Sequence, residues 1–391
     1  MFCKATLIPV TLALLTTTSS IVHAPGVKVA LEERSTLTRA DRTFDHENVI
    51  LDGIKIQNKY QRNLRNLLAN TDSLPKGWEI KDFITVSSSS EKHAVGIEAL
   101  ANDKNVEWLG PITIGTPNQP FNIQIDTGSP NLWIPSSSCA NPLCNGKSKY
   151  NASALSTSSQ KNGTFIISYG DNSTVSGPIY TDTVIITGLT TTDQYFSSVT
   201  IVSASFGKHP SDGILGLSYG SLSCLGGVYP FFNTLINQKK VSMGKFGFTL
   251  GSVSSELYLG GTDTSKYTGS IEYHDVVTLT GLWMATGAKS LVGLTTMSSG
   301  FNMIIDSGKT YMYALQAMVS AFYVAIQGSF IFKSKTWEVT NANFNRGETS
   351  MGSSQCVGAL IATSKGLGLG DNTWLLGDAF MKNVYTTFSF N

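Results

Sequence analysis

The stretch that decides the fold reads Phe121-Asn-Ile-Gln-Ile-Asp-Thr-Gly-Ser-Pro-Asn-Leu-Trp-Ile-Pro-Ser136. Apolar and polar residues alternate up to Asp126, which is the pattern of a β-strand with one buried face. An Asp-Thr-Gly-Ser turn follows at once, and glycine permits the tight backbone of such a turn. A second apolar run, Met303-Ile-Ile305, leads into Asp306-Ser-Gly-Lys309. The two similar turns predict two related lobes, each of which gives one carboxylate to a shared centre.

A pair of neighbouring aspartates is suited to acid–base chemistry on water. Two close carboxylates cannot both ionise cheaply, so they share one proton, and one acts as base while the other acts as acid. Hydroxyls of Thr127, Ser129 and Ser307 can bind the carboxylates or the opposite turn. Lys309, however, stands where a small hydroxyl residue is expected. An ammonium about 4 Å from Asp306 would favour its ionised form by roughly three pKa units, whereas a side chain turned to solvent would be screened.

These motifs resemble those of the pepsin-like aspartic endopeptidases of eukaryotes, in particular a secreted fungal member. The resemblance runs from about residue 105 to the end of the sequence. Beyond the two aspartate turns it rests on Tyr169-Gly-Asp-Asn-Ser173, Ser211-Asp-Gly-Ile-Leu-Gly-Leu217, Leu257-Tyr-Leu-Gly-Gly261 and Trp374-Leu-Leu-Gly-Asp378. It implies an all-β, bilobal fold with the active-site cleft between the lobes, and peptide hydrolysis without a cofactor or a metal.

The resemblance also assigns roles to individual residues. It implies that Asp126 and Asp306 are the catalytic carboxylates and that Gly128 and Gly308 border the substrate. The carboxylates would be supported by Thr127, Ser129, Ser307 and Lys309. A turn-capping role is the alternative for Asp126, and Asp378 has a structural role.

A flap over the cleft is expected at Tyr169 and Gly170, where the tyrosine would close over the substrate and exclude water. Trp133 resembles the family's tryptophan that donates its ring N–H to this tyrosine. The alternatives are a cross-strand packing role for Tyr169 and a plain core role for Trp133. Asn172 replaces a glycine common at the flap tip.

Composition agrees with a β-rich fold. Of 391 residues, 14% are charged and 37 are glycine, which favours short strands and many turns. Strands are expected at Thr164–Ser168, Thr183–Ile186, Phe246–Leu250 and Leu257–Leu259, and helices at Pro230–Lys239 and Leu315–Gln327. The formal net charge of +1 gives no indication of nucleic-acid or membrane-surface binding.

The N-terminus has the pattern of a signal peptide over residues 1–24. Lys4 precedes an apolar run from Leu7 to Leu15, and Val22-His-Ala24 has small residues where a signal peptidase cleaves. The run is too short to span a membrane, although an anchor or a buried helix is the alternative. The pattern predicts a secreted protein, with the vacuole as the alternative location.

Residues 25–95 read as a removable propeptide. They hold 11 of the 28 lysines and arginines, whereas Arg346 is the only arginine from residue 96 onward. Such cations can pair with carboxylates near neutral pH and be released in acid; a disordered linker is the alternative. By resemblance, a propeptide lysine bridges the catalytic aspartates. Lys59 beside Tyr60 is a candidate, and Lys76 and Lys81 remain open. Cleavage is expected near the Ser87–Ser90 run. The N-terminal catalytic lobe is expected at 96–275 and the C-terminal one at 276–391.

Five cysteines bear on the fold, of which Cys3 would leave with the signal peptide. Cys139 and Cys144 read as a small-loop disulfide in a secreted protein. No His or Cys partners lie at ligand spacing, so a metal site is not expected. Cys356 resembles half of the family's C-lobe disulfide, but no partner lies near Trp337, and a bond to Cys224 would have to join different lobes.

The C-terminal lobe is expected to be shortened. The chain is shorter than family members between Trp337 and Cys356, and it stops early at Phe388-Ser-Phe-Asn391. Three sequons, at Asn151, Asn162 and Asn172, predict a glycoprotein.

Two functions are therefore considered. An acid endopeptidase would bind an extended peptide between the lobes and use the aspartate pair to activate water and protonate the leaving nitrogen. The alternative is an impaired relative or truncated gene product that only binds peptides, which Lys309 and the shortened lobe motivate. The expected partners are peptide or protein substrates and the chain's own propeptide. The protein is expected to be a monomer that binds neither nucleic acid nor membrane.

Overall fold

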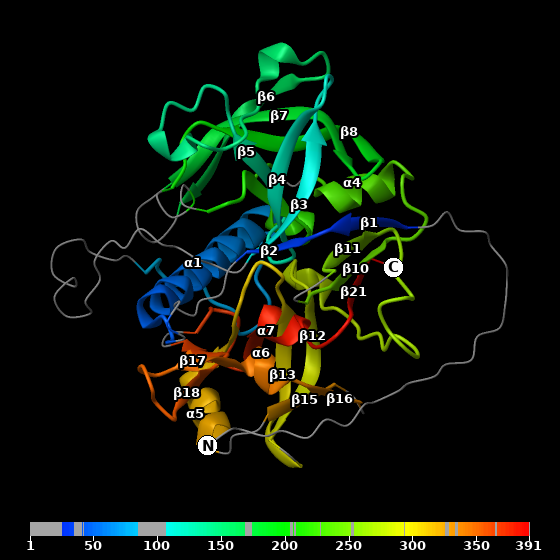
Figure 1. Ribbon diagram of the computed structural model, residues 1–391. Coiled ribbons are helices and arrows are strands. Elements are labelled where there is room, and N and C mark those ends of the chain that lie inside the picture. The colour runs from blue at the N-terminus through cyan, green and yellow to red at the C-terminus, as the bar shows by residue number, and fades with distance from the viewer. Residues whose placement is uncertain are drawn as a thin grey trace.

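The computed structural model describes residues 26–34, 41, 43–84, 107–168, 174–203, 206, 209–226, 228–251, 254–292, 294–324, 328–332, 335–363 and 366–390. The predicted signal peptide, the Ser87–Ser90 run, Asn172 and the flap residues Tyr169 and Gly170 lie outside these ranges. Within them the molecule is mostly β and forms two lobes, one above the other in Figure 1, which confirms the predicted fold class. No helix in the described part of the chain is long and apolar enough to cross a membrane.

The N-terminal lobe is built on an eight-stranded sheet. In sheet order its strands are β2 (Glu32–Arg34), β3 (Glu107–Ile114), β4 (Gln119–Asp126), β9 (Gly213–Gly216), β5 (Leu132–Pro135), β8 (Leu189–Val199), β7 (Thr174–Ile186) and β6 (Ser159–Ser168). The strands expected at 164–168 and 183–186 are the ends of β6 and β7. Strand β4 ends at Asp126 and runs parallel to β9, with Ile125 opposite Leu215.

The C-terminal lobe repeats this arrangement in a seven-stranded sheet. Its strands in sheet order are β16 (Lys335–Glu338), β15 (Gly328–Phe332), β12 (Met284–Val292), β13 (Thr295–Ile305), β20 (Thr373–Leu376), β14 (Met312–Leu315) and β19 (Leu360–Thr363). Strand β13 ends one residue before Asp306 and runs parallel to β20, with Ile305 opposite Leu376. Each aspartate therefore lies at the end of a strand that has a parallel neighbour.

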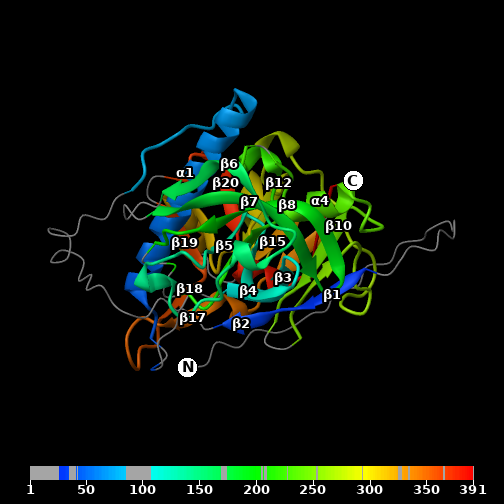
Figure 2. The same ribbon diagram turned by 90° about the horizontal axis from the view of Figure 1, so that it is seen from above.

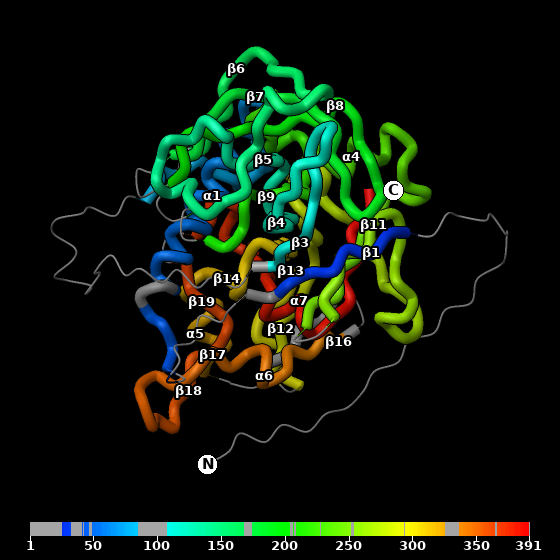
Figure 3. Tube along the Cα trace, turned by 45° about the horizontal axis from the view of Figure 1, so that its top comes forward, coloured from blue at the N-terminus to red at the C-terminus, as the bar shows by residue number. Residues whose placement is uncertain are grey.

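A four-stranded sheet brings the two ends of the described chain together. Its order is β1 (Val27–Ala30), β11 (Glu256–Leu259), β10 (Lys245–Thr249) and β21 (Thr386–Ser389). Figure 3 shows the blue β1 beside β11. A small hairpin-like pair, β17 (Asn345–Glu348) and β18 (Cys356–Gly358), lies at the edge of the C-terminal lobe.

Helices are few among the described residues. The α-helices are α1 (His46–Thr71), α4 (Phe231–Asn237), α5 (Gln316–Val324), α6 (Asn341–Phe344) and α7 (Asp378–Met381), and the 3-10 turns are η1 (Pro142–Cys144), η2 (Ala152–Ala154), η3 (Gly220–Leu222) and η4 (Thr278–Thr280). The helices expected at 230–239 and 315–327 are present as the shorter α4 and α5. The longest helix, α1, was not expected from the sequence.

Helix α1 lies between the two lobes in Figure 1. Figure 2, seen from above, shows it along one side of the molecule, partly behind strands of the N-terminal lobe. One side of the helix is fully buried in the main core, which also includes residues of both lobes. The residues on that side are Val49, Ile56, Tyr60, Leu64 and Leu67. Their spacing of three, four or seven residues is that of one helical face. The disordered-linker alternative is therefore wrong for this stretch.

The predicted disulfide between Cys139 and Cys144 is present. It packs in a second, smaller core cluster of the N-terminal lobe with Trp133 and Phe206. Cys224 and Cys356 are free thiols, in agreement with the doubt about a bond between them.

We predict a modest stabilising role for this disulfide. Replacing both Cys139 and Cys144 by serine should lower the free energy of unfolding by about 2 kcal/mol, because a short closed loop restricts the unfolded chain only slightly. Urea denaturation at neutral pH measures the change, and Cys356→Ser at an exposed free thiol is the matched control. Equal midpoints for the double variant and the control would contradict the prediction.

Candidate active site

The two aspartate turns hold each other across the lobe boundary. The Thr127 N–H donates to Ser307 Oγ at 3.1 Å, and the Ser307 N–H donates to Thr127 Oγ1 at 2.9 Å. The Thr127 hydroxyl donates to the carbonyl of Ile305 at 3.2 Å, and the Ser307 hydroxyl to that of Ile125 at 3.1 Å. This reciprocal set fixes the position of one turn against the other.

Within each turn, a glycine N–H orients the carboxylate. Gly128 donates to Asp126 Oδ1 at 2.9 Å, and Gly308 donates to Asp306 Oδ1 at 2.9 Å. A Cβ at residue 128 would lie 2.3 Å from Asp306 Oδ2, and one at residue 308 would lie 2.3 Å from Asp126 Oδ1. Each glycine is therefore required because the opposite carboxylate approaches its Cα.

The pseudo-symmetry ends one residue later. Ser129 Oγ donates to Asp126 Oδ2 at 2.5 Å, and Lys309 at the corresponding position has no hydroxyl. Its backbone N–H donates to the carbonyl of Asp306, and its carbonyl accepts from the Asp378 N–H. Its half-buried side chain lines a cavity beside the aspartates, and no ion pair joins it to Asp306 among the described residues.

The ammonium of Lys59 lies between the two carboxylates. Its Nζ is 2.9 Å from Asp126 Oδ1 and 2.9 Å from Asp306 Oδ2. The hydroxyl of the next residue, Tyr60, donates to Asp306 Oδ2 at 3.0 Å. Of the three lysines that the sequence left open, Lys59 is thus the bridging one, whereas Lys81 pairs with Glu79. The distinction depends on where the helix lies, which no local sequence signal reports.

Amide side chains tie α1 to both lobes. Asn63 Nδ2 donates to the Gly128 carbonyl at 3.0 Å, and Gln61 Nε2 donates to the Leu367 carbonyl at 2.9 Å. Asn66 Nδ2 donates to the Leu222 carbonyl at 2.9 Å. These contacts were missed from the sequence because asparagine and glutamine on a helix are more often solvated.

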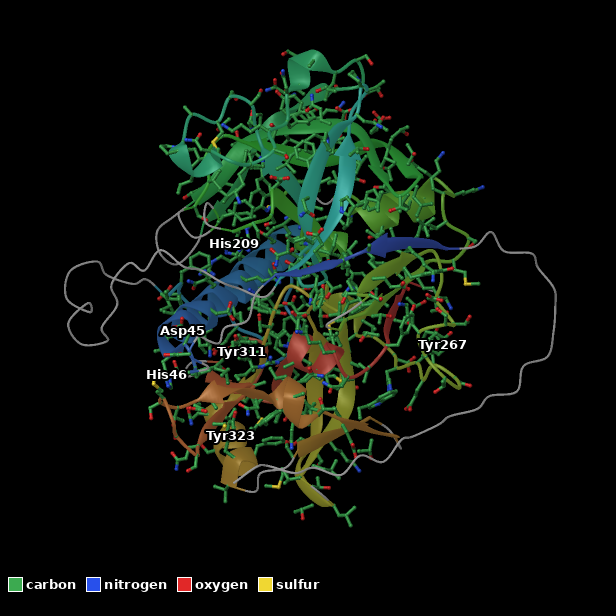
Figure 4. The ribbon with its side chains drawn as sticks, in the orientation of Figure 1. Asp45, His46, His209, Tyr267, Tyr311 and Tyr323 are labelled. Atoms are coloured by element: carbon green, nitrogen blue, oxygen red, sulfur yellow. A yellow bond between two sulfur atoms is a disulfide. The ribbon has the colours of Figure 1, made fainter. Side chains whose placement is uncertain are left out.

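The beginning of the helix contacts the C-terminal lobe. Figure 4 labels Asp45 and His46 at this end of α1 and Tyr311 on the lobe. The ring of Phe44 lies 4.8 Å from that of His46 and 6.3 Å from that of Tyr311, measured between centroids. The segment is therefore anchored before the helix starts as well as along it.

Burial and the neighbouring charges move the pKa values of the bridging groups apart. Burial would raise the pKa of Asp126, but Lys59 and the Ser129 hydroxyl outweigh it, and the pKa lies below its ordinary value. Burial raises the pKa of Asp306; Lys59 opposes this, Asp126 reinforces it, and the net shift is upward. Burial would lower the pKa of Lys59, yet the two carboxylates raise it. Lys59 is therefore charged.

A cavity of about 100 Å³ remains between α1 and the lobes. On the lobe side Trp133, Phe206 and Lys309 help to line it, and the rings of Trp133 and Phe206 lie 4.4 Å apart. The expected bond between Trp133 and Tyr169 involves a residue outside the described ranges and stays a prediction. The described residues contain no cluster of three His, Cys, Asp or Glu that could hold a metal ion.

Known proteins match most of the chain. The family model described as eukaryotic aspartyl protease matches residues 107–329 and 325–391. An aspartic protease of Phaffia rhodozyma is 39% identical over 324 residues, covering 76% of this chain and 77% of its own length. Rhizopuspepsin of Rhizopus chinensis is 33% identical, covering 73% and 76%. Endothiapepsin of Cryphonectria parasitica is 34% identical, covering 72% of each.

The family match does not test the predicted shortening of the C-terminal lobe. Its two stretches, 107–329 and 325–391, overlap at residues 325–329. The overlap lies before the stretch between Trp337 and Cys356, where the sequence predicts that the lobe is shortened. The shortening therefore stays a prediction.

We predict that the reciprocal bonds between the turns support the stability of the whole molecule. Ser307→Ala removes one hydroxyl and leaves the buried Thr127 N–H without its acceptor, which should cost about 1–3 kcal/mol. The free energy of unfolding in urea at neutral pH measures this loss. Ser299→Ala, at an exposed position of β13, should change it by less than about 0.5 kcal/mol; equal losses in both variants would refute the prediction.

Proposed function

Because the chain belongs to the eukaryotic aspartyl proteases and is an acid endopeptidase, we propose that Asp126 and Asp306 are its catalytic carboxylates. The observation that carries this proposal is their convergence on one ammonium at the boundary of two similarly built lobes. The alternative of an impaired relative finds no support in the family and relatives matched above.

The proposed reaction follows from two carboxylates held a short distance apart. The ionised carboxylate takes a proton from a water molecule, which attacks the scissile carbonyl carbon, and the protonated carboxyl donates to the carbonyl oxygen as it gains negative charge. Protonation of the leaving nitrogen then breaks the C–N bond. The N–H groups of Gly128 and Gly308 and the hydroxyl of Ser129 would hold the carboxylates in orientation. Tyr169 and Gly170 would close over the peptide as the flap.

Residues 25–95 are proposed to be a propeptide that keeps the enzyme inactive. The Lys59 ammonium contacts both carboxylates, so a water molecule cannot take the position between them. Helix α1 also fills the space between the lobes that an extended peptide would need. Catalytic lobes at 96–275 and 276–391 would remain after cleavage.

Acid is expected to release this propeptide. The pKa of Asp126 is lowered in the closed form, so its ion pair stabilises that form above the ordinary aspartate pKa of about 3.9. This contribution declines as the pH falls below that value. Burial and Asp126 raise the pKa of Asp306, whereas Lys59 lowers it, so the expected loss of the closed form in acid rests on Asp126.

Secretion with removal of residues 1–24 is proposed, with a vacuolar location as the alternative. The disulfide between Cys139 and Cys144 supports an oxidising compartment. Of the sequons, Asn162 is exposed and is the proposed glycosylation site. A monomer is proposed as the active form.

The first test is Asp126→Asn. The amide cannot act as the base, so the turnover of a peptide substrate at acid pH should fall at least about 100-fold. Asp371→Asn, at an exposed position, is the matched control and should retain turnover. Undiminished cleavage by the Asp126 variant would overturn the proposed mechanism.

The second test concerns the lysine. Lys59→Met removes the charge that lowers the pKa of Asp126, so the closed form should be lost at a higher pH. We expect the midpoint of self-processing, followed by gel electrophoresis across a pH series, to rise by about one unit. Lys76→Met, at an exposed propeptide position, should leave the midpoint in place. An unchanged or lower midpoint for Lys59→Met would contradict the proposed role.

A further inference from the structure

Helix α1 carries a carboxylate, that of Asp52, which is buried against the C-terminal lobe. Tyr313 on β14 donates its hydroxyl to Asp52 Oδ2 at 2.5 Å. Tyr313 is 0% exposed and Asp52 only 5%, so neither group is stabilised by bulk water. A hydrogen bond to a carboxylate is among the stronger kinds in proteins. Departure of α1 would therefore leave the Tyr313 hydroxyl without this acceptor and open to another one.

The same region contains a cation that belongs to the catalytic lobes. Asp52 and Lys309 both line the cavity beside the aspartate pair. The other lysines and arginine in this lining are Lys55, Lys59 and Arg62 of α1, which would leave with the propeptide. Among the described residues, Lys309 is then the one lysine or arginine that the lobes contribute to it. No ion pair joins Lys309 to Asp52 in the described part of the chain.

We propose that Tyr313 and Lys309 form a carboxylate-binding subsite of the substrate cleft. Asp52 fills this subsite in the full-length chain, and an acidic side chain of the peptide substrate fills it after α1 has left. The enzyme therefore prefers peptides that carry a glutamate or aspartate at the corresponding position. This inference rests on the proposed catalytic pair and on the proposed release of α1.

The two residues have different tasks in this subsite. Burial, and then the negative charge of Asp52, raise the pKa of Tyr313 far above its ordinary value, so its hydroxyl acts as a donor throughout the acid range. A hydroxyl can donate to either a carboxylate or a carboxamide oxygen. Lys309 supplies the positive charge that distinguishes the carboxylate from the carboxamide. Tyr313 thus sets the position of the side chain and Lys309 sets its charge.

The preference should depend on pH. A glutamate side chain has an ordinary pKa of about 4.3, so the substrate carboxylate is mostly ionised at pH 5 and mostly protonated at pH 3. The other titratable lobe groups that line the cavity are Asp126 and His209. Asp306 lies beside them, because it contacts the same Lys59 ammonium as Asp126. The titration of these groups changes the cleavage rates of the glutamate peptide and the glutamine peptide alike. Its effect therefore largely cancels in the ratio of the two rates.

The experiment uses the mature enzyme and an uncharged peptide in which each position in turn carries glutamine or glutamate. At one position, kcat/KM should be about tenfold higher for glutamate at pH 5, and the ratio should fall towards one at pH 3. In Lys309→Met the ratio at pH 5 should approach one. In Tyr313→Phe, kcat/KM at that position should instead fall several-fold for the glutamate and the glutamine peptide alike. Lys289→Met, at an exposed position of β12 outside the cavity, should retain the wild-type ratio.

Each outcome decides one of the two proposals. If no position favours glutamate in the wild type, the proposed subsite is wrong. It is also wrong if the glutamate preference survives Lys309→Met. If Lys309→Met fails to fold or cleave, the wild-type scan and Tyr313→Phe decide the matter. If Asp126→Asn no longer cleaves the uncharged peptide, and the wild type has a glutamate-to-glutamine ratio of kcat/KM near one at every position, only the subsite is rejected. Cleavage that persists in Asp126→Asn would instead reject the catalytic pair.

Discussion

The contact of one ammonium with two buried carboxylates is the interaction on which the rest of this structure depends. Asp126 is 4% exposed and Asp306 is 0% exposed, and removing such charges from water costs several kcal/mol each unless they are paired. Lys59 supplies the counter-charge to both, and the N–H groups of Gly128 and Gly308 also donate to these carboxylates. The lysine can reach this point only if its helix lies between the lobes. The position of α1, and the set of amide bonds that hold it there, follow from that requirement.

The two lobes offer similar local structure at the aspartate turns, and one difference between the turns lies next to the carboxylates. Strand β4 and strand β13 each end at a turn whose glycine allows close approach of the opposite aspartate. Ser129 binds Asp126, whereas Lys309 offers Asp306 no hydroxyl. The pKa of Asp126 is lowered and that of Asp306 is raised. The asymmetry of one residue thus accompanies the separation of acid and base within an otherwise repeated site.

The sequence was sufficient to predict those features that depend on local order. Alternation before Asp126 predicted β4, and the short spacing from Cys139 to Cys144 predicted their bond. Helix α1 was missed although its apolar residues have helical spacing, because lysine, asparagine and glutamine occupy its other faces. Such residues suggest solvent, but here they are buried against a polar cleft, where Gln61 and Asn63 find backbone carbonyls. Only the tertiary position of the helix distinguishes Lys59 from Lys76 and Lys81.

The geometry also answers the doubt that Lys309 raised. The concern was that its ammonium would keep Asp306 charged and so prevent the pair from sharing a proton. In the structure it forms no ion pair with Asp306 among the described residues, and burial raises the pKa of Asp306 more than Lys309 lowers it. The larger opposing influence is Lys59, which belongs to the helix. On the proposed release of that helix, Asp306 would lose its strongest counter-charge while Asp126 remains beside it. Lys309 is therefore compatible with a shared proton, and its charge is available to act on the peptide.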